Sequence, residues 1–331
     1  MNDIQGPVPP GPVLVTGATG MLGSRLVELL SAAGWDVRAL ARNSADAHAS
    51  SLVGAIVVSG DVTDSASLRA AVKGCTAVFH TAALVPESGI AEEDFHSVNV
   101  DGTRNVLEAA AEAGVQRVVH VSTINAIDGR PGVVANETTG PPRVPHTGYD
   151  ASKVAGEEIA LNSDLDVVVV NPAVIFGPRS RHSGRIIELF LRGRMPVVPI
   201  PGRRMSFAFV DDVARGAILA MQRGRVGERY ILASPPITLG DFISDLAAVS
   251  GRKKPRISLP AWPVVTVVAA LNLISGVTRW RPPVTVTGIR KGGALFDGNK
   301  ARHDLGLEYT PMRDALATTV AWIRNQRDSP G

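Results

Sequence analysis

The sequence of 331 residues predicts an α/β protein with a doubly wound parallel sheet and a smaller, mostly helical lobe. Short apolar runs alternate with helical patterns, and this alternation is typical of parallel strands connected by crossover helices. The chain is also long enough to form about two lobes around one large core. The expected strands begin at Val13 and then span Val37–Ala41, Ala55–Val58, Ala77–His80, Arg117–Ser122 and Val167–Asn171.

A glycine-rich turn separates the first strand from the first helix. Gly17 allows a tight turn, Gly20 lets a ligand approach the backbone, and Gly23 lets the helix pack closely on its strand. The helix expected from Met21 to Gly34 directs its free N–H groups and its positive dipole end toward the turn. Glycine triplets also occur in ordinary turns, but here a strand precedes the triplet and a helix follows it. This order indicates a Rossmann fold that holds a dinucleotide pyrophosphate at the turn.

Composition and charge exclude several classes of function. The formal net charge is +3 and the basic residues are scattered, which argues against nucleic-acid binding. None of the seven histidines has a metal-ligand spacing and no cysteine cluster accompanies them, so we expect no metal site. The single cysteine, Cys75, excludes an internal disulfide and favours a reducing, cytoplasmic location. Residues 1–11 are rich in proline and glycine and lack an apolar signal core, so we expect a flexible tail there.

Residues after the second and third strands bear on the choice of cofactor. An acidic residue after the second strand would bind the adenosine ribose of NAD, but this chain has Ala41 followed by Arg42. A cation without a carboxylate suits a 2′-phosphate, so the sequence favours NADP(H) over NAD(H); the alternative is a solvated surface arginine. Asp61, after the third strand, is expected either at the adenine edge or at the N-cap of the next helix.

Tyr149 and Lys153 lie at the start of a helix that is expected to end near Leu161. Their spacing places the phenol and the ammonium on one helical face. A nearby ammonium and an oxidised nicotinamide both favour the phenolate and so lower the pKa of the phenol. Tyr149 could then exchange a proton with a substrate oxygen. An isolated pair of this kind is usually a surface feature, but this pair follows a dinucleotide turn in the same chain.

Together these motifs resemble those of the extended short-chain dehydrogenases/reductases, within the NAD-dependent epimerase/dehydratase superfamily. Thr16–Gly23 matches the family's TGxxGxxG pattern, and Tyr149 with Lys153 matches its YxxxK pattern. The resemblance covers nearly the whole chain and implies an α/β fold that binds a nicotinamide dinucleotide. Further matching segments are Asp61-Val62, His80–Ala83, Asn99–Thr103 and Asn171–Gly177.

The resemblance also implies roles for individual residues. It makes Tyr149 the proton donor or acceptor, Lys153 the group that lowers its pKa and binds the nicotinamide ribose, and Thr123 the group that orients the reacting oxygen. Ser122 directly precedes Thr123 and is the alternative to it. Asn99 is implied to support the active site, with capping or packing as the alternative. The implied cofactor contacts are Gly17, Thr19, Gly20, Met21, Leu22, Gly23, Arg42, Asp61, Val62, Thr81, Ala82, Ala83, Tyr149, Lys153, Pro172 and Val174.

Within this superfamily the chain is most similar to the dihydroflavonol-reductase-like and hopanoid-associated sugar-epimerase-like branch. Sugar-nucleotide epimerases carry an Arg-Asp pair where this chain has Met205-Ser206, and sugar dehydratases carry an acidic pair where it has Ile124-Asn125. Both departures speak against nucleotide-sugar chemistry. The resemblance instead implies an enzyme that acts on ketones or secondary alcohols with apolar or aromatic skeletons.

The remaining segments are expected to build a second lobe. We expect residues 12–178 and 207–238 to form the NAD(P)-binding domain, and residues 179–206 and 239–328 to form the substrate-binding lobe. Residues 257–277 carry no charge, and an uncharged stretch of about 20 residues is long enough to span a bilayer. Early prolines and polar residues near its end favour a shorter helix, either buried or interfacial. An interfacial helix would give peripheral membrane contact through residues 259–277.

The sequence therefore predicts an NADP(H)-dependent oxidoreductase that interconverts a ketone and a secondary alcohol on a hydrophobic small molecule. The alternatives are a nucleotide-sugar 4-epimerase that uses bound NAD, and a catalytically silent nucleotide-binding protein. We expect a cytoplasmic protein, or a membrane-associated one if residues 259–277 meet a bilayer. The family resemblance suggests a homodimer.

Overall fold

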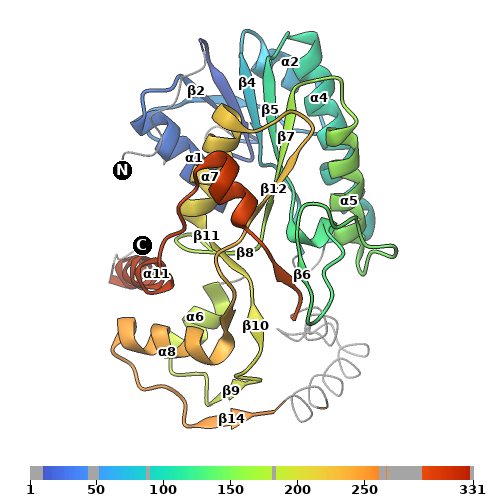
Figure 1. Ribbon diagram of the computed structural model, residues 1–331. Helices are drawn as coiled ribbons and strands as arrows, with labels where there is room; N and C mark the ends of the chain where they lie inside the picture. Colours follow the sequence, from blue (N-terminus) through green and yellow to red (C-terminus); the bar gives the residue numbers. More distant parts are fainter. Residues whose placement is uncertain are drawn as a thin grey trace.

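A seven-stranded parallel sheet forms the centre of the protein, as the sequence predicts (Figure 1). The computed structural model describes residues 10–43, 52–86, 90–180, 184–260, 266 and 293–328. The strand order is β12-β7-β5-β4-β1-β2-β3, so the direction of winding reverses between β1 and β4. Ligands of such sheets bind beyond the carboxyl ends of the strands at this reversal. The strands are β1 (Val13–Thr16), β2 (Val37–Ala41), β3 (Ile56–Ser59), β4 (Ala77–His80), β5 (Arg117–Val121), β7 (Val167–Pro172) and β12 (Arg229–Leu232).

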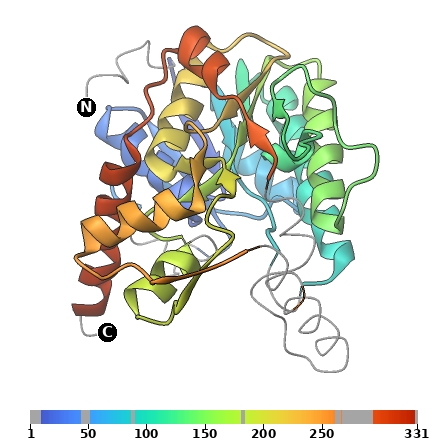
Figure 2. The same cartoon turned by 60° about the horizontal axis from the view of Figure 1, so that its bottom comes forward.

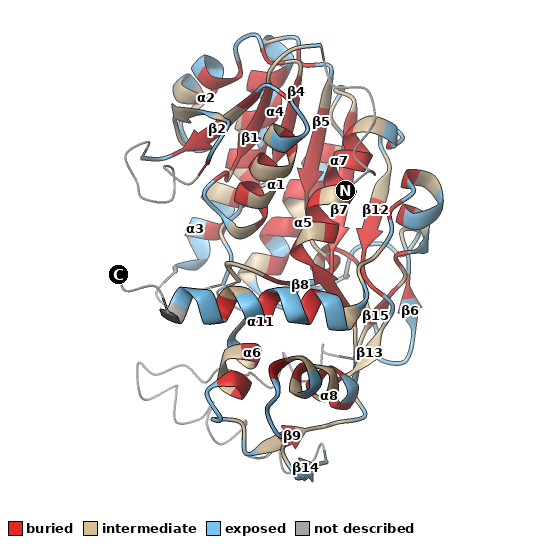
Figure 3. Ribbon diagram, turned by 90° about the vertical axis from the view of Figure 1, so that its left-hand side faces the viewer, coloured by how far each residue is buried: buried red, intermediate tan, exposed pale blue. Residues whose placement is uncertain are grey.

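Helices cover both faces of the sheet, which explains why its strands are almost continuously apolar. On one face α1 (Met21–Ala32) packs against α7 (Val210–Arg223). On the other face α4 (Gly102–Glu112) lies between α2 (Ser65–Val72) and α5 (Gly148–Leu161). Alternate residues of β1 enter the two resulting cores, and Figure 3 shows that the sheet and the inner sides of these helices are buried.

Side-chain caps fix where two of these helices begin. The Thr147 hydroxyl accepts the Asp150 N–H at 3.1 Å and starts α5 one residue before Tyr149. Asp64 caps α2 by accepting the Ala66 N–H at 3.0 Å. The alternative prediction that Asp61 is the N-cap is therefore wrong. Asp61 instead accepts hydrogen bonds from the backbone N–H and the hydroxyl of Thr63, both at 2.9 Å. Its carboxylate thus closes the turn that precedes the helix.

The second lobe consists of short elements below the carboxyl edge of the sheet in Figure 1. Helix α8 (Leu239–Ser250) packs on α11 (Met312–Asp328), and Phe242 of α8 stacks on Phe207 with 4.7 Å between ring centroids. The other elements of the chain are α3 (Glu92–His96), π-helix η1 (Ser97–Asp101), 3-10 helix η2 (Ile124–Ala126), β6 (Val134–Ala135), β8 (Val174–Phe176), α6 (Gly184–Leu191), β9 (Val197–Pro199), β10 (Arg204–Met205), β11 (Phe207–Phe209), β13 (Ile237–Thr238), β14 (Ile257–Leu259), β15 (Leu295–Phe296) and π-helix η3 (Ala301–Leu305).

The short strand pairs were not predicted from the sequence. They are β8 with β11, β9 with β14, β10 with β13 and β6 with β15, each of two or three residues, too short to show an alternating pattern. Most of the uncharged stretch 257–277 lies outside the described residues. Among the residues that the structure describes, no helix is long and apolar enough to cross a membrane. The division of the chain into two domains stays a prediction.

We predict that Gly23→Ala destabilises the fold. A Cβ on Gly23 would overlap the Gly17 carbonyl group, so α1 would have to move away from β1. Overpacking of this kind costs about 1–3 kcal/mol. Urea unfolding should show this loss of unfolding free energy, whereas the control Gly140→Ala, which meets nothing within 4 Å, should change it little. Equal stability of the two variants would contradict the close approach.

Candidate active site

The glycine-rich turn leaves an open cradle at the carboxyl end of β1. Gly17 adopts a φ of +66°, and a Cβ there would lie 2.7 Å from backbone atoms of Ala82. The Gly20 N–H closes the turn on the Gly17 carbonyl at 2.9 Å. Ser24 N–H then makes the first helical bond, to the Gly20 carbonyl, so the N–H groups of the preceding helical residues have no intrahelical acceptor. Free N–H groups, a helix N-terminus and a turn without side chains fit a dinucleotide pyrophosphate.

A buried hydrogen-bond chain joins β1, β4 and α4 directly behind this turn. Thr16 Oγ1 lies 2.8 Å from His80 Nδ1, and His80 Nε2 lies 3.0 Å from Thr103 Oγ1. The Thr103 hydroxyl donates to the Asn99 carbonyl at 2.7 Å, so it must accept from His80 Nε2. His80 Nδ1 then accepts from Thr16. These roles are those of a neutral imidazole, and burial favours that form because it lowers the pKa of His80 to about 3.

A second buried imidazole, His120 on β5, stands beside His80 with 5.2 Å between ring centroids. Neither of its nitrogens has a hydrogen-bond partner within the described part of the chain. Burial, the Lys153 ammonium and His80 all lower the pKa of His120 well below 6.5. Both rings are therefore uncharged at neutral pH.

Tyr149, Thr123 and Lys153 meet at the carboxyl end of β5. The Tyr149 phenol is hydrogen-bonded to the Thr123 side chain, and its ring packs edge-on against Phe95 of α3 at 5.9 Å. The Lys153 ammonium is buried and donates to the Val121 carbonyl at 2.9 Å. The structure thus brings the three predicted catalytic residues together and uses Thr123 rather than Ser122 to contact the phenol.

The pKa of Tyr149 differs from the sequence-based expectation. Burial, followed by the Asp150 carboxylate, raises it to about 12 in the protein alone, and the hydrogen bond from Thr123 offsets this only in part. The expected lowering by Lys153 is not found, since Lys153 is not among the groups that shift the pKa of Tyr149. Burial also lowers the pKa of Lys153 to about 8, although Glu157 opposes the shift.

Glu157 supplies the counter-charge one helical turn beyond Lys153. Its carboxylate accepts from Asn171 Nδ2 at 2.6 Å and lies 3.2 Å from an Arg229 nitrogen. Asn171 also donates to the Thr123 carbonyl at 3.1 Å. These contacts tie α5 to the ends of β7 and β12 and hold the backbone of Thr123 in place.

Asn99 links the loop after β4 to α5. Its Oδ1 accepts the Leu84 N–H at 2.7 Å, while its Nδ2 donates to the Leu84 carbonyl at 3.0 Å and to Ser152 Oγ at 2.9 Å. Asn99 lies in the π-helix η1, and such segments are frequent at functional sites. A Cβ on Gly156 would lie 2.6 Å from the Asn99 carbonyl oxygen, so α5 approaches η1 closely. The predicted supporting role of Asn99 thus has a geometric basis.

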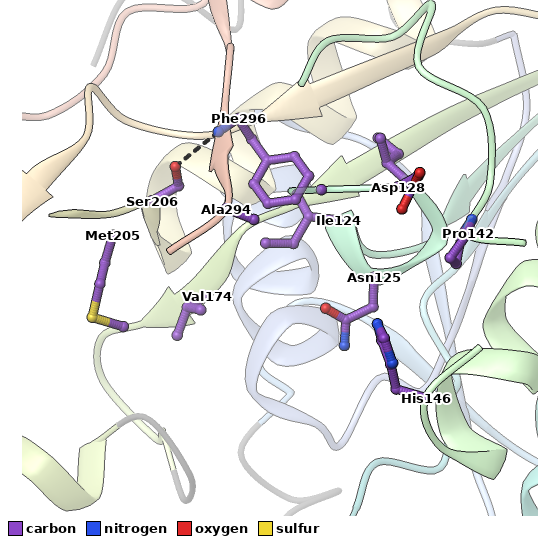
Figure 4. A pocket seen from close by; sticks show the side chains of 12 residues that line it. Ile124, Asn125, Asp128, Pro142, His146, Val174, Met205, Ser206, Ala294 and Phe296 are labelled. Carbon is purple, nitrogen blue, oxygen red and sulfur yellow. Dashed lines mark hydrogen bonds between the residues drawn. The ribbon is translucent and has the colours of Figure 1, made fainter. Parts of the chain in front are cut away.

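A cavity of about 230 Å³ is lined in part by residues that neighbour Thr123 and Tyr149 in the sequence (Figure 4). Its lining comes from η2 beside Thr123, from the residues before Tyr149, and from β8, β10 and β15. Figure 4 shows Asn125 and His146 together on one side, with Asp128, Ser206 and several apolar side chains around the rest. The cavity is lined by Ile124, Asn125, Ile127, Asp128, Gly129, Pro142, His146, Val174, Met205, Ser206, Ala294 and Phe296.

The remaining predicted cofactor residues lie along the same edge of the sheet. Thr19, Gly20, Arg42 and Ala83 are exposed, whereas Leu22 and Val62 are part of the core. The Thr81 hydroxyl donates to the Thr16 carbonyl at 2.7 Å and braces the turn. Val174 lines the cavity.

The sequence interpretation missed several neighbours of the site. Asn125 donates to the buried Asp150 at 2.8 Å and so connects η2 to the residue after Tyr149. Phe95, His120 and His146 were not singled out either. Adjacency to Thr123 and Tyr149 could have indicated Asn125, Asp150 and His146, but Phe95 and His120 carry no signal that distinguishes them from core residues.

Comparisons with known proteins agree with this geometry. The sequence pattern of the NAD dependent epimerase/dehydratase family matches residues 13–233. Sterol demethylase protein B of Methylococcus capsulatus is 36% identical over 95% of this chain and 98% of that protein. A 4-hydroxy-2-methyl-3-oxo-4-farnesyl-3,4-dihydroquinoline-1-oxide ketoreductase of Stigmatella aurantiaca is 33% identical over 88% of this chain and 90% of that protein.

A solved structure supports the same assignment of the fold. The crystal structure of gox2253 superposes with a TM-score of 0.82 and 33% identity, and it covers 96% of this chain and 98% of the other.

We predict that acid destabilises the protein through its two buried histidines. Below about pH 6.5 the unfolded chain protonates both rings and the folded chain does not. The neutral rings therefore contribute fully to the free energy of unfolding above that pH, and this contribution is lost as the pH falls toward 3. Each ring contributes a slope of about 1.4 kcal/mol per pH unit.

Replacing His120 with phenylalanine removes one of the two imidazoles that take up a proton when the protein unfolds in acid. Urea unfolding of His120→Phe between pH 6 and 4.5 should show a slope smaller by about 1.4 kcal/mol per pH unit. The exposed His303 provides the matched control, and His303→Phe should leave the slope in place. An unchanged slope in His120→Phe would mean that the ring is protonated in the fold.

Proposed function

The chain belongs to the NAD dependent epimerase/dehydratase family, and from this premise we propose that it is an NADP(H)-dependent oxidoreductase that reduces a ketone on a hydrophobic small molecule. The family and its ketoreductase relatives make it an NAD(P)-dependent enzyme acting on CH–OH and C=O groups. One observation carries the finer proposal: the Tyr149 phenol is hydrogen-bonded to Thr123, and the residues that follow Thr123 line a partly apolar cavity.

Tyr149 acts as the proton donor in this proposal. A phenol whose pKa lies near 12 is protonated at neutral pH, and the proton can pass to the substrate oxygen as that oxygen becomes an alkoxide. The Thr123 hydroxyl holds the same oxygen in line, and Lys153 stabilises the phenolate that remains. The bound nicotinamide supplies the hydride.

Two features support a hydrophobic substrate. The apolar side chains of the cavity are those of Ile124, Ile127, Val174, Met205 and Phe296, and its polar ones are those of Asn125, Asp128, His146 and Ser206. A few polar groups in an apolar pocket orient a ligand without binding it along its whole length. The relatives include proteins named for a sterol and for a farnesylated dihydroquinoline.

Arg42 supports the choice of NADP(H). It is exposed directly after β2, where a 2′-phosphate would lie, and the residue before it is alanine rather than an acid. The cradle and the triad would also serve a nucleotide-sugar 4-epimerase with bound NAD. Met205 and Ser206 stand where such enzymes carry an Arg-Asp pair, which favours the reductase.

We predict that Tyr149→Phe abolishes most of the turnover. Loss of a positioned general acid lowers rates by about 100- to 10,000-fold. NADPH affinity should stay within about twofold because the ring is kept, a difference well under 1.4 kcal/mol. The measurement is NADPH oxidation with a panel of apolar ketones, with Tyr230→Phe, which removes a buried hydroxyl bonded to the Arg225 N–H, as the matched control. An active Tyr149→Phe variant would show that another group is the acid.

We predict that Arg42→Ala weakens NADPH binding selectively. A charge-assisted hydrogen bond contributes about 1.5–3 kcal/mol, so NADPH affinity should fall about 10- to 100-fold. NADH affinity should hardly change. Fluorescence titration with both nucleotides measures this, and Arg69→Ala, an exposed arginine on α2, is the control. Equal losses for NADH and NADPH would exclude the 2′-phosphate role, and tight NADH binding without net turnover would favour the epimerase.

A further inference from the structure

A cluster of exposed cations lies on the second lobe, outside the candidate active site. It is formed by helix α6 and by the two segments that lead into β9 and β14. We define the basic patch as Arg185, Arg192, Arg194, Arg252, Lys253 and Arg256, all of them exposed.

The fold brings these residues onto one surface although they are far apart in sequence. Strand β14 pairs in parallel with β9, with Ile257 opposite Val197, so the segments before the two strands run side by side. The Arg252 guanidinium lies close to Gly193. A Cβ built on Gly193 would be 3.2 Å from a guanidinium nitrogen of Arg252. Arginines of α6 and of the following turn also line a hollow of about 190 Å³.

The positive charge of the basic patch is largely uncompensated. Glu188, 3.5 Å from Arg192, is the one acid that lines the hollow. Within the described ranges no ion pair involves Arg194, Arg252 or Arg256. In the hollow three arginines face one glutamate, which gives a positive local field in a chain whose net charge is only +3.

An apolar edge adjoins the basic patch. Ile257 follows Arg256 on β14 and is 59% exposed. In sequence, the 18 residues from 260 to 277 that follow β14 contain no charged side chain. Basic clusters next to uncharged apolar segments are typical of proteins that bind anionic lipid headgroups.

We propose that the basic patch binds the phosphate headgroups of an anionic lipid bilayer and docks the second lobe on it. Figure 1 places β9 and β14 at the end of the molecule opposite β2 and β4, so docking there leaves the nucleotide-binding sheet away from the bilayer. The proposal is independent of the catalytic assignment. It gives the enzyme access to apolar molecules dissolved in the membrane.

Vesicle sedimentation of the full-length protein tests the basic patch. The probes are vesicles of phosphatidylcholine alone and of phosphatidylcholine with phosphatidylglycerol, at low and high salt. The protein should sediment with the anionic vesicles at low salt, and salt should release it because it screens the charges. Arg252→Glu with Arg256→Glu should lower partitioning at least tenfold, since each basic residue near the surface contributes about 1 kcal/mol.

The matched control reverses two exposed cations elsewhere. Arg69→Glu with Lys73→Glu, on and beside α2, changes the net charge equally and should keep vesicle binding. Equal loss in both double variants, equal binding to neutral vesicles, or no binding at all would overturn the proposal. So would retention of both double variants on anionic vesicles. Turnover of a water-soluble ketone by the patch variant should equal that of the wild type, which separates this result from the proposed reaction.

Discussion

The burial of one ammonium, that of Lys153, constrains the chemistry of the whole site. The group is out of water, donates to the end of β5 and has Glu157 as its counter-charge. Burial lowers the pKa of His80 and of His120 and holds both rings neutral, and the Lys153 cation adds to both shifts. Tyr149 is likewise held as the neutral phenol by burial. The site is thus arranged with a proton to donate and one positive charge to stabilise the anion left behind.

The sheet provides the rigid frame for this arrangement. Adjacent parallel strands place Thr16, His80 and His120 in register, so three polar side chains cross one face of the sheet behind the glycine turn. Hydrogen bonds to Thr16 and to Thr103 of α4 fix the imidazole of His80, and Asn99 fixes the next loop from η1. Buried polar contacts therefore hold the glycine-rich turn, where the cofactor is expected, in a fixed position relative to Tyr149 and Lys153 on α5. Such contacts specify geometry more than they add stability.

Much of this could be predicted from the sequence because it depends on local signals. Six of the seven strands of the sheet and helices α1 and α5 follow from apolar runs and glycines. Thr123, Tyr149 and Lys153 were identified by spacing and family resemblance. The pairing of His120 with His80 could not be predicted, because it depends on which strands are neighbours. The raised pKa of Tyr149 was missed for a related reason. Spacing places Lys153 on the same helical face, but only the tertiary structure shows that its ammonium donates to Val121 and that loss of solvent raises the pKa of the phenol.

The central claim is that Tyr149 is a half-buried phenol whose ionisation the cofactor controls. Titration of tyrosine absorbance tests it directly, because the chain contains only three tyrosines and Tyr149→Phe identifies the signal. In the protein alone, Tyr149 should stay un-ionised up to about pH 12. With saturating NADP⁺, whose nicotinamide is positively charged, the same group should ionise at a pH lower by several units. An identical titration with and without NADP⁺, or one unaffected by Tyr149→Phe, would contradict the account.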